Sequence, residues 1–263
     1  MIVSFLTISI IKLFATAQIP DILIHNGDTL SIFANPLEQL YEKDTIRPDF
    51  FGKKEGCMLT ACWRGYQAEW IIIDNQLFLT GIYSCCYYED KIKADLKQLF
   101  GNKCIDGKVK ADWFTASIIA PKGKRLYYVH MGYGSLYEKE LELQFEKGKL
   151  IGSKTYDNSK SKQSDYSQDS EILLDFIYSN INWDKLPKNN KTIKVYIQFS
   201  SNENGIIDSA IVMRGYSKIY DQEALRVVKS IPEWDIYYRR GVHERRGWNI
   251  PIIFSAEKRT KYN

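Results

Sequence analysis

The sequence predicts an α+β protein with two folded parts, a larger β-rich domain followed by a small domain of helices and strands. The chain of 263 residues is long for one domain, and 44% of its residues are hydrophobic, which suffices for packed cores. It contains 18 Tyr and 6 Trp, and aromatic residues favour strands. Residues 152–170 are rich in Ser, Lys, Asp and Asn, so they are predicted to form a flexible linker.

The first residues have the pattern of an export signal. Residues 2–14 are apolar apart from Ser, Thr and one Lys, and an A-x-A motif at residues 15–17 precedes Gln18. The apolar run is shorter than the roughly 20 residues that span a membrane. We therefore predict a signal peptide over residues 1–17 and a periplasmic protein. The alternative is an inner-membrane anchor formed by the same apolar run.

Residues 18–151 are predicted to form a mostly antiparallel β domain with one helix. Residues 74–75 and 147–148 have the composition of hairpin turns. A short helix is expected over residues 92–100, where apolar side chains recur on one side. The expected strands are residues 68–73, 77–82, 114–120, 126–130 and 140–145.

Four side chains of this β domain are candidates for a ligand groove. Trp63, Arg64 and Tyr133 are of the kinds that line grooves by stacking, and His130 precedes a Gly-Tyr-Gly turn and has the side chain of a general base. No nucleophile motif such as G-x-S-x-G is present, and no catalytic residue or cofactor is predicted. An enzyme or ligand-binding protein with its site near His130, Asp112 and Arg64 is the alternative function. Ordinary sheet packing is the competing interpretation of these side chains.

All five cysteines lie in the β domain. Cys57 and Cys62 are separated by four residues and no matching Cys or His pair follows, so a metal site is not expected. In an oxidising compartment, Cys57 or Cys62 can pair with Cys85 or Cys86, which gives one or two disulfides and leaves at least one thiol free. Buried, unpaired cysteines are the other interpretation.

The last third of the chain has the most regular pattern. Residues 193–199 alternate between apolar and polar, as in a strand with one buried face. Asn204-Gly205 is a strong hairpin signal, and a second strand is expected over residues 206–215.

A helix is predicted next, over residues 220–230. Asp221 stands where an N-cap residue belongs, and Pro232 prevents the helix from continuing. In the final strand the side chains that share one side are Trp248, Ile250, Ile252 and Phe254. With an amphipathic segment over residues 172–181, this gives a helix–strand–strand–helix–strand domain over residues 171–256, and residues 257–263 are left as a tail.

This domain contains several short motifs, each of which occurs once. They are Gly205, Gly215, Asp221 with Glu223-Ala224-Leu225-Arg226, Pro232 with Trp234, and Ile250-Pro251-Ile252 with Phe254. In this order and spacing, residues 170–256 resemble the C-terminal domain of TonB-type proteins. The chain departs from that pattern at residues 235–241, where the family often has a Pro-Gly turn.

The resemblance implies a protein that binds other envelope proteins and catalyses nothing. It implies that an extended segment of a partner, such as an outer-membrane receptor, pairs with the edge of the last strand, here residues 247–255. Pro251 suits an edge strand because it has no N–H to donate. The partner-binding residues expected from it are Arg245, Arg246, Trp248, Ile250, Ile252 and Phe254. A protected edge without a partner is the competing interpretation.

The net charge, an Arg-rich loop and three short sequence motifs bear on the possible partners. A net charge of +4 is too small to suggest nucleic-acid binding. The Arg-rich loop at residues 239–246 is a candidate for contact with a membrane surface or an acidic partner, and a solvated turn is the alternative. Residues 61–66, 112–114 and 129–134 resemble an uncharacterised family of exported Bacteroidetes-type proteins. The oligomeric state cannot be predicted from these patterns.

Overall fold

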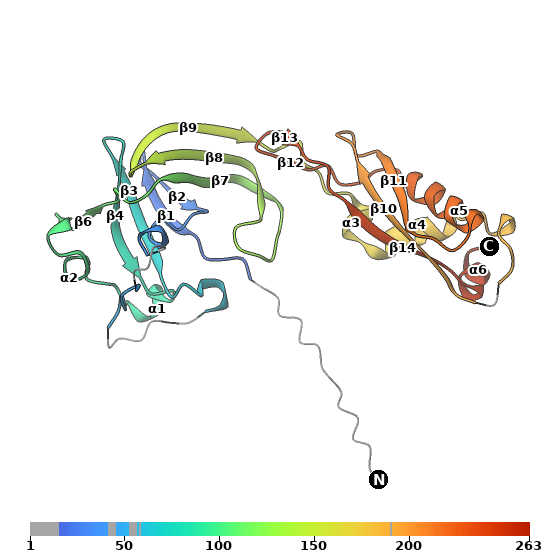
Figure 1. Cartoon of the computed structure of the whole chain (residues 1–263), viewed down its shortest axis with the longest axis horizontal. Helices are drawn as coiled ribbons and strands as arrows, with labels where there is room; N and C mark the ends of the chain where they lie inside the picture. Colours follow the sequence, from blue (N-terminus) through green and yellow to red (C-terminus); the bar gives the residue numbers. More distant parts are fainter. Residues whose placement is uncertain (1–15, 42–45, 53–56, 58, 190) are drawn as a thin grey trace, which may run out of the picture. The chain divides into compact units, whose positions relative to one another are not determined.

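The computed structural model describes residues 16–41, 46–52, 57, 59–189 and 191–263. The fold is α+β and dominated by strands, as the sequence predicts (Figure 1). No helix within the described ranges is long and apolar enough to cross a membrane. The predicted signal peptide and the alternative anchor lie outside the described residues except for Thr16 and Ala17.

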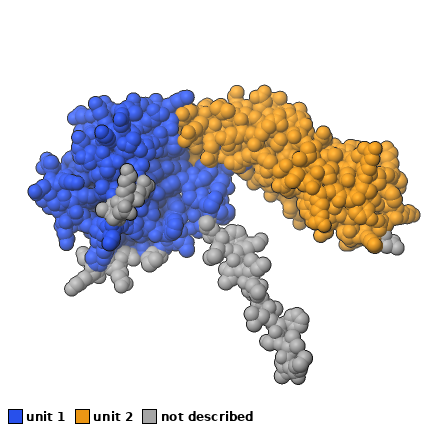
Figure 2. All heavy atoms as spheres, viewed as in Figure 1, with its two compact units in different colours: residues 1–136, 141–155 blue, residues 137–140, 156–263 orange. Residues whose placement is uncertain are grey.

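The chain divides into two compact units (Figure 2). The N-terminal unit comprises residues 1–136 and 141–155, and the C-terminal unit comprises residues 137–140 and 156–263. The boundary therefore falls within two long strands, β8 (Leu136–Glu146) and β9 (Lys149–Asp157).

The N-terminal unit contains a nine-stranded sheet with the order β2-β1-β3-β4-β9-β8-β7, in which β6 also pairs with β4 and β5 pairs with β6. The strands other than β8 and β9 are β1 (Asp21–His25), β2 (Asp28–Ile32), β3 (Gln67–Ile73), β4 (Gln76–Tyr83), β5 (Cys104–Ile105), β6 (Lys108–Lys110) and β7 (Ala116–Tyr127). The sheet is mostly antiparallel, as expected, but β1 pairs with β3 in parallel. Its ends also approach each other, because the N–H of Phe33, after β2, donates to the carbonyl of Ile119 in β7 (2.7 Å).

The core of this unit follows the alternation along its strands. Ala68 and Trp70 of β3 and Leu77 and Leu79 of β4 are fully buried, because every second side chain points to the same face. The predicted turns at residues 74–75 and 147–148 are present, with positive φ at all four residues. This geometry matches the right-handed twist of the paired strands.

Several boundaries in this unit differ from the predictions. The strands expected at 114–120 and 126–130 are one strand, β7, which continues through Pro121 and Gly123. The single expected helix is replaced by α1 (Tyr87–Asp90) and α2 (Leu96–Phe100), which starts where the Asp95 carboxylate accepts from the N–H groups of Lys97 and Gln98. The first hairpin, β1–β2, was not predicted.

The flexible linker predicted over residues 152–170 is wrong. Residues 152–157 belong to β9, and the helices α3 (Asp165–Gln168) and α4 (Ser170–Ser179) begin before the predicted boundary. Asn158 is completely buried, and it bonds to the main chain of Tyr137, Glu138 and Gly241. Polar side chains therefore fix this segment by tertiary hydrogen bonds, which satisfy groups that composition alone would assign to solvent.

The C-terminal unit has the predicted helix–strand–strand–helix–strand order. After α4 come β10 (Ile193–Ser201), β11 (Ile207–Arg214), α5 (Lys218–Lys229) and β14 (Trp248–Phe254). The three strands form an antiparallel sheet with the order β11-β10-β14. Helix α5 runs beside β10 and β11 (Figure 1), and its Ala224, Val227 and Val228 are buried in one core with β10.

Three details of this unit correct the predictions. Helix α5 begins after Ser217, and the Asp221 side chain accepts from the N–H of Tyr216 instead of capping the helix at residue 221. A small two-stranded ribbon, β12 (Tyr238–Arg239) and β13 (Val242–His243), occupies the Arg-rich loop. The predicted tail forms the helix α6 (Ala256–Tyr262), which starts at Ser255, whose hydroxyl accepts from the N–H of Lys258.

Candidate functional site

The last strand lies at an edge of its sheet, as expected, but its apolar side chains do not face outward. Among the described strands, β14 pairs with β10 alone. Ile250, Ile252 and Phe254 are buried with the residues of α4 and α5. The face that these side chains share is therefore the core face, and the main chain of β14 is the part of these residues that a partner strand could reach.

The outer main chain of β14 has few donors left for strand addition. The N–H of Ile253 points away from β10 and donates to the hydroxyl of Tyr178 in α4 (3.3 Å). By alternation, Pro251 also presents its main chain outward, and proline has no N–H. Residues 249, 251 and 253 all present their main chain away from β10. Of these three, Asn249 is the one whose N–H could pair with a partner strand. A partner strand would find mainly carbonyls along this edge.

The other three predicted residues contact their own chain. Arg245 donates two hydrogen bonds to the Asp208 carboxylate (2.7 and 2.6 Å), which lower the pKa of Asp208 below its usual range. The Arg246 guanidinium lies 3.2 Å from the centre of the Tyr237 ring. Trp248 is half-buried and packs edge-to-face against Trp234. Arg245, at about half exposure of its side chain, is open to solvent beside this internal contact.

The face of the sheet opposite the helices carries exposed apolar side chains. Tyr196 of β10 lies opposite Pro251 of β14 in the register, and Ile211 of β11 lies opposite Gln198. Tyr196, Ile211 and Met213 are 37%, 54% and 59% exposed, and Pro251 is exposed as well. We call Tyr196, Ile211, Met213 and Pro251 the open face. Three neighbouring strands contribute to it, so the apolar side chains form a group rather than isolated residues.

The sequence contains a pattern that indicates this open face, although no open face was predicted from it. The second strand is apolar at both parities, because Ala210 and Val212 alternate with Ile211 and Met213. A strand with one solvated face would show alternation with polar residues instead. Such a run indicates apolar side chains on both faces of the sheet.

The groove predicted in the N-terminal unit is assembled only in part. The Arg64 guanidinium donates to the hydroxyl of Tyr133 (2.9 Å), so these two residues do come together. Trp63 points into solvent with 79% of its surface exposed, and exposed His130 packs its ring against Tyr128. The four residues therefore do not line one groove.

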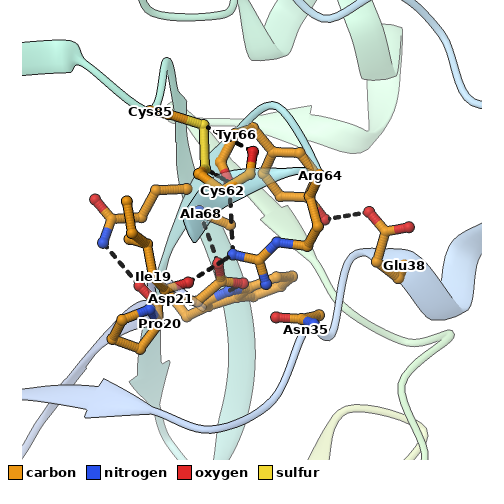
Figure 3. A network of polar contacts seen from close by, with 12 residues as sticks. Ile19, Pro20, Asp21, Asn35, Glu38, Cys62, Arg64, Tyr66, Ala68 and Cys85 are labelled. Atoms are coloured by element: carbon orange, nitrogen blue, oxygen red, sulfur yellow. Dashed lines mark hydrogen bonds and ion pairs between the residues drawn. A yellow bond between two sulfur atoms is a disulfide. The ribbon is translucent and has the colours of Figure 1, made fainter. Parts of the chain in front are cut away.

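Arg64 is instead the centre of a buried polar network (Figure 3). Its Nη2 donates to the carbonyl of Ile19 (3.0 Å) and to the carboxylate of Asp21 (3.1 Å). Asp21, the first residue of β1, also accepts from the N–H of Ala68 (3.1 Å) and from the indole of Trp70 (3.2 Å) in β3. The network therefore joins β1, β3 and the loop before β3.

Burial controls the ionisation of this network. Asp21 is completely buried, and desolvation raises the pKa of its carboxyl to about 6, although the Arg64 charge acts in the opposite direction. Burial also raises the pKa of Tyr133 to about 12, so its hydroxyl stays protonated and donates to Asn35 (2.8 Å). The pKa of Tyr66 is raised as well, and its hydroxyl donates to Glu38 (2.6 Å). These contacts engage the charged groups with one another rather than with a vacant groove.

The trio suggested for an enzyme is not brought together. Ala111, the neighbour of exposed Asp112, bonds to Leu77 beside the β3–β4 turn, whereas Arg64 lies before the start of β3. About six residues of strand separate these positions, which is roughly 20 Å at about 3.3 Å per residue. Asp112 and Arg64 therefore cannot share one reaction centre in this structure.

The cysteine pairing is resolved. Cys57 pairs with Cys86 and Cys62 pairs with Cys85, while Cys104 is a buried free thiol. The two bonds attach the segment around residues 57–62 to the turn after β4. In the part of the chain that the structure describes, no cluster of three or more His, Cys, Asp or Glu could hold a metal ion.

Comparisons of the chain with protein-family models, with curated proteins and with solved structures found no match. Membership of the TonB-type family therefore stays a prediction that depends on the motifs of residues 170–256.

Proposed function

We propose that this chain is an exported cell-envelope protein that binds another envelope protein through the open face of its C-terminal unit. The exposed apolar side chains of Tyr196, Ile211 and Met213 carry the proposal. Grouped apolar residues on the surface of a small unit are a feature of protein-binding sites. An aromatic side chain such as Tyr196, near the middle of such a group, supplies contact area at low entropic cost.

The mode of binding differs from the strand addition that the TonB-type resemblance implies. Pro251 and the Tyr178–Ile253 hydrogen bond reduce the donors at the β14 edge, so main-chain pairing there would be weak. Packing of partner side chains against the open face needs no free main-chain donors. An outer-membrane receptor is the partner that the resemblance suggests, which would connect the protein to transport across that membrane.

Two disulfides support export. Disulfides persist in oxidising compartments such as the periplasm and are rare in the cytosol. Four of the five cysteines are paired, and the predicted signal peptide would deliver the chain to such a compartment.

Site-specific photo-crosslinking in living cells tests the binding face. A photoreactive amino acid replaces Tyr196 in one variant and Glu171, which is exposed on α4, in a control variant. We expect a covalent adduct with one envelope protein from position 196 and none from position 171, because α4 lies on the opposite side of the sheet. Equal labelling from both positions, or none from position 196, would reject the open face as the binding site.

A further inference from the structure

A cavity of about 260 Å³ lies in the C-terminal unit, where β14 ends and α6 begins. Three aromatic side chains form its floor, and each of them is 4% exposed or less. They are Trp183 of a 3₁₀ turn (Trp183–Lys185), Tyr220 of α5 and Phe254 of β14, and we call them the aromatic floor. The Phe254 ring packs edge-to-face against Trp183 (6.0 Å between ring centres) and Tyr220 (5.0 Å), so the floor is already assembled by the fold.

The rim of this cavity is basic. Arg259 of α6 and Lys188 line it, whereas no Asp or Glu of the described residues does. Within the described ranges, neither of these two cations forms an ion pair with an acidic side chain, unlike Arg245 and Arg226 of the same unit. Positive charge that the protein itself does not neutralise attracts an anion to the cavity.

Arg259 is fixed beside the aromatic floor by its own chain. Its Nη2 donates to the carbonyls of Leu186 (2.9 Å) and Pro187 (3.1 Å), and its guanidinium carbon lies 5.7 Å from the centre of the Trp183 ring. Its Nη1 and Nε donate to no group of the described residues. The contacts of one nitrogen therefore position the guanidinium, and the donors of the other two remain for a ligand.

We propose that this cavity binds a small aromatic carboxylic acid. The ring of the ligand would stack on the aromatic floor, and its carboxylate would accept charge-assisted hydrogen bonds from Arg259, with the Lys188 ammonium nearby. A neutral ligand would leave both cations without a counter-charge, and an acid without a ring would leave the floor uncovered. Sites for small molecules begin at about 300 Å³, so a cavity of this size admits one ring with its acid group rather than a larger cofactor.

The inference does not depend on the proposed function. Ile193 and Phe254, which both line the cavity, belong to the face of the sheet that the helices cover. Tyr196 and the rest of the open face lie on the other side of the same sheet. Binding of the acid and binding of the envelope partner can therefore be measured separately in one protein.

Saturation-transfer NMR titrations of the full-length protein test the class of ligand. The probes are phenylacetate, its uncharged counterpart phenylacetamide, and acetate, which lacks the ring. For a ligand as small as phenylacetate we expect a Kd on the order of 1 mM. Phenylacetamide and acetate should each bind at least about tenfold more weakly, because each loses one of the two kinds of contact. Equal affinity for phenylacetate and phenylacetamide, or no saturable binding of phenylacetate, would overturn the proposal.

Three variants locate the binding in this cavity. Arg259→Gln removes the charge but keeps an amide that can donate to the Leu186 and Pro187 carbonyls, so it should weaken phenylacetate at least about tenfold. Arg240→Gln, at an exposed arginine outside the cavity, should leave this affinity unchanged. Thr260→Phe places a ring into the cavity from the exposed side of α6, so it should abolish binding while circular dichroism shows a folded protein.

Wild-type affinity for phenylacetate in both Arg259→Gln and Thr260→Phe would contradict the assignment of the site. Loss of the crosslink from position 196 with phenylacetate binding intact would count against the proposed function alone.

Discussion

Asp21 is an acidic residue that the fold removes completely from water. Its carboxylate is completely buried and receives hydrogen bonds from a guanidinium, a main-chain N–H and an indole. Removing one partner of a buried ion pair is costly because the other charge remains without compensation. The Asp21–Arg64 contact is thus better explained as a structural tie between β1 and the loop before β3 than as part of a binding site.

The raised pKa of Asp21 predicts a pH dependence of stability. The folded state binds the proton more tightly than the unfolded state, in which the pKa is near 3.8, so this group stabilises the fold below about pH 4. That stabilisation is lost as the pH rises through about 6, and two pKa units correspond to at most about 3 kcal/mol. In urea titrations, the stability of the wild type relative to Asp21→Asn should therefore increase as the pH falls from 7 to 4. A relative decrease would show that the ion pair with Arg64 outweighs desolvation.

At the scale of elements, β14 and β10 each direct alternate side chains into the core, while the open face lies on the other side of the same sheet. Ile252 is 1% exposed, and an Asp at this position would bury a charge without a partner. We expect Ile252→Asp to destabilise the C-terminal unit by more than about 3 kcal/mol. Ile211→Asp on the exposed face should change stability by less than about 1 kcal/mol. Hydrogen exchange of the α5 amides measures both effects, and equal protection in the two variants would contradict the assignment of faces.

The elements that sequence predicts well are those with strong local periodicity. Strands β10 and β11, with α5 after them, follow from apolar spacing and from the Asn204-Gly205 turn, and the tertiary structure does not override these preferences. The β1–β2 hairpin, which was not among the predicted elements, carries the same signal, Asn26-Gly27 between alternating residues.

Other features could not be read from local patterns. The segment after β9 is polar and resembles a linker, yet Ser164 is buried, receives a hydrogen bond from the N–H of Tyr166 and donates one to the carbonyl of Glu233, 69 residues away. Long-range hydrogen bonds of this kind leave no trace in composition. The candidate site shows the same limit: the sequence located the strand Trp248–Phe254 at an edge, but which face is covered depends on where α4 and α5 pack.

For the whole molecule, export is the condition on which the proposed function depends. Binding to an envelope partner requires the chain to leave the cytoplasm, and the two disulfides require an oxidising environment. The proposed function combines the predicted signal peptide over residues 1–17, the two disulfides and the open face. It therefore requires that the mature protein is located in the cell envelope.

The intact mass of the protein from fractionated cells tests this claim most directly. We predict a product that begins at Gln18, lacks four hydrogens because of its two disulfides, and is recovered with the periplasmic fraction. An uncleaved product in the inner membrane would mean that residues 2–14 are a retained anchor. An uncleaved, fully reduced product in the cytoplasm would contradict the proposed function altogether.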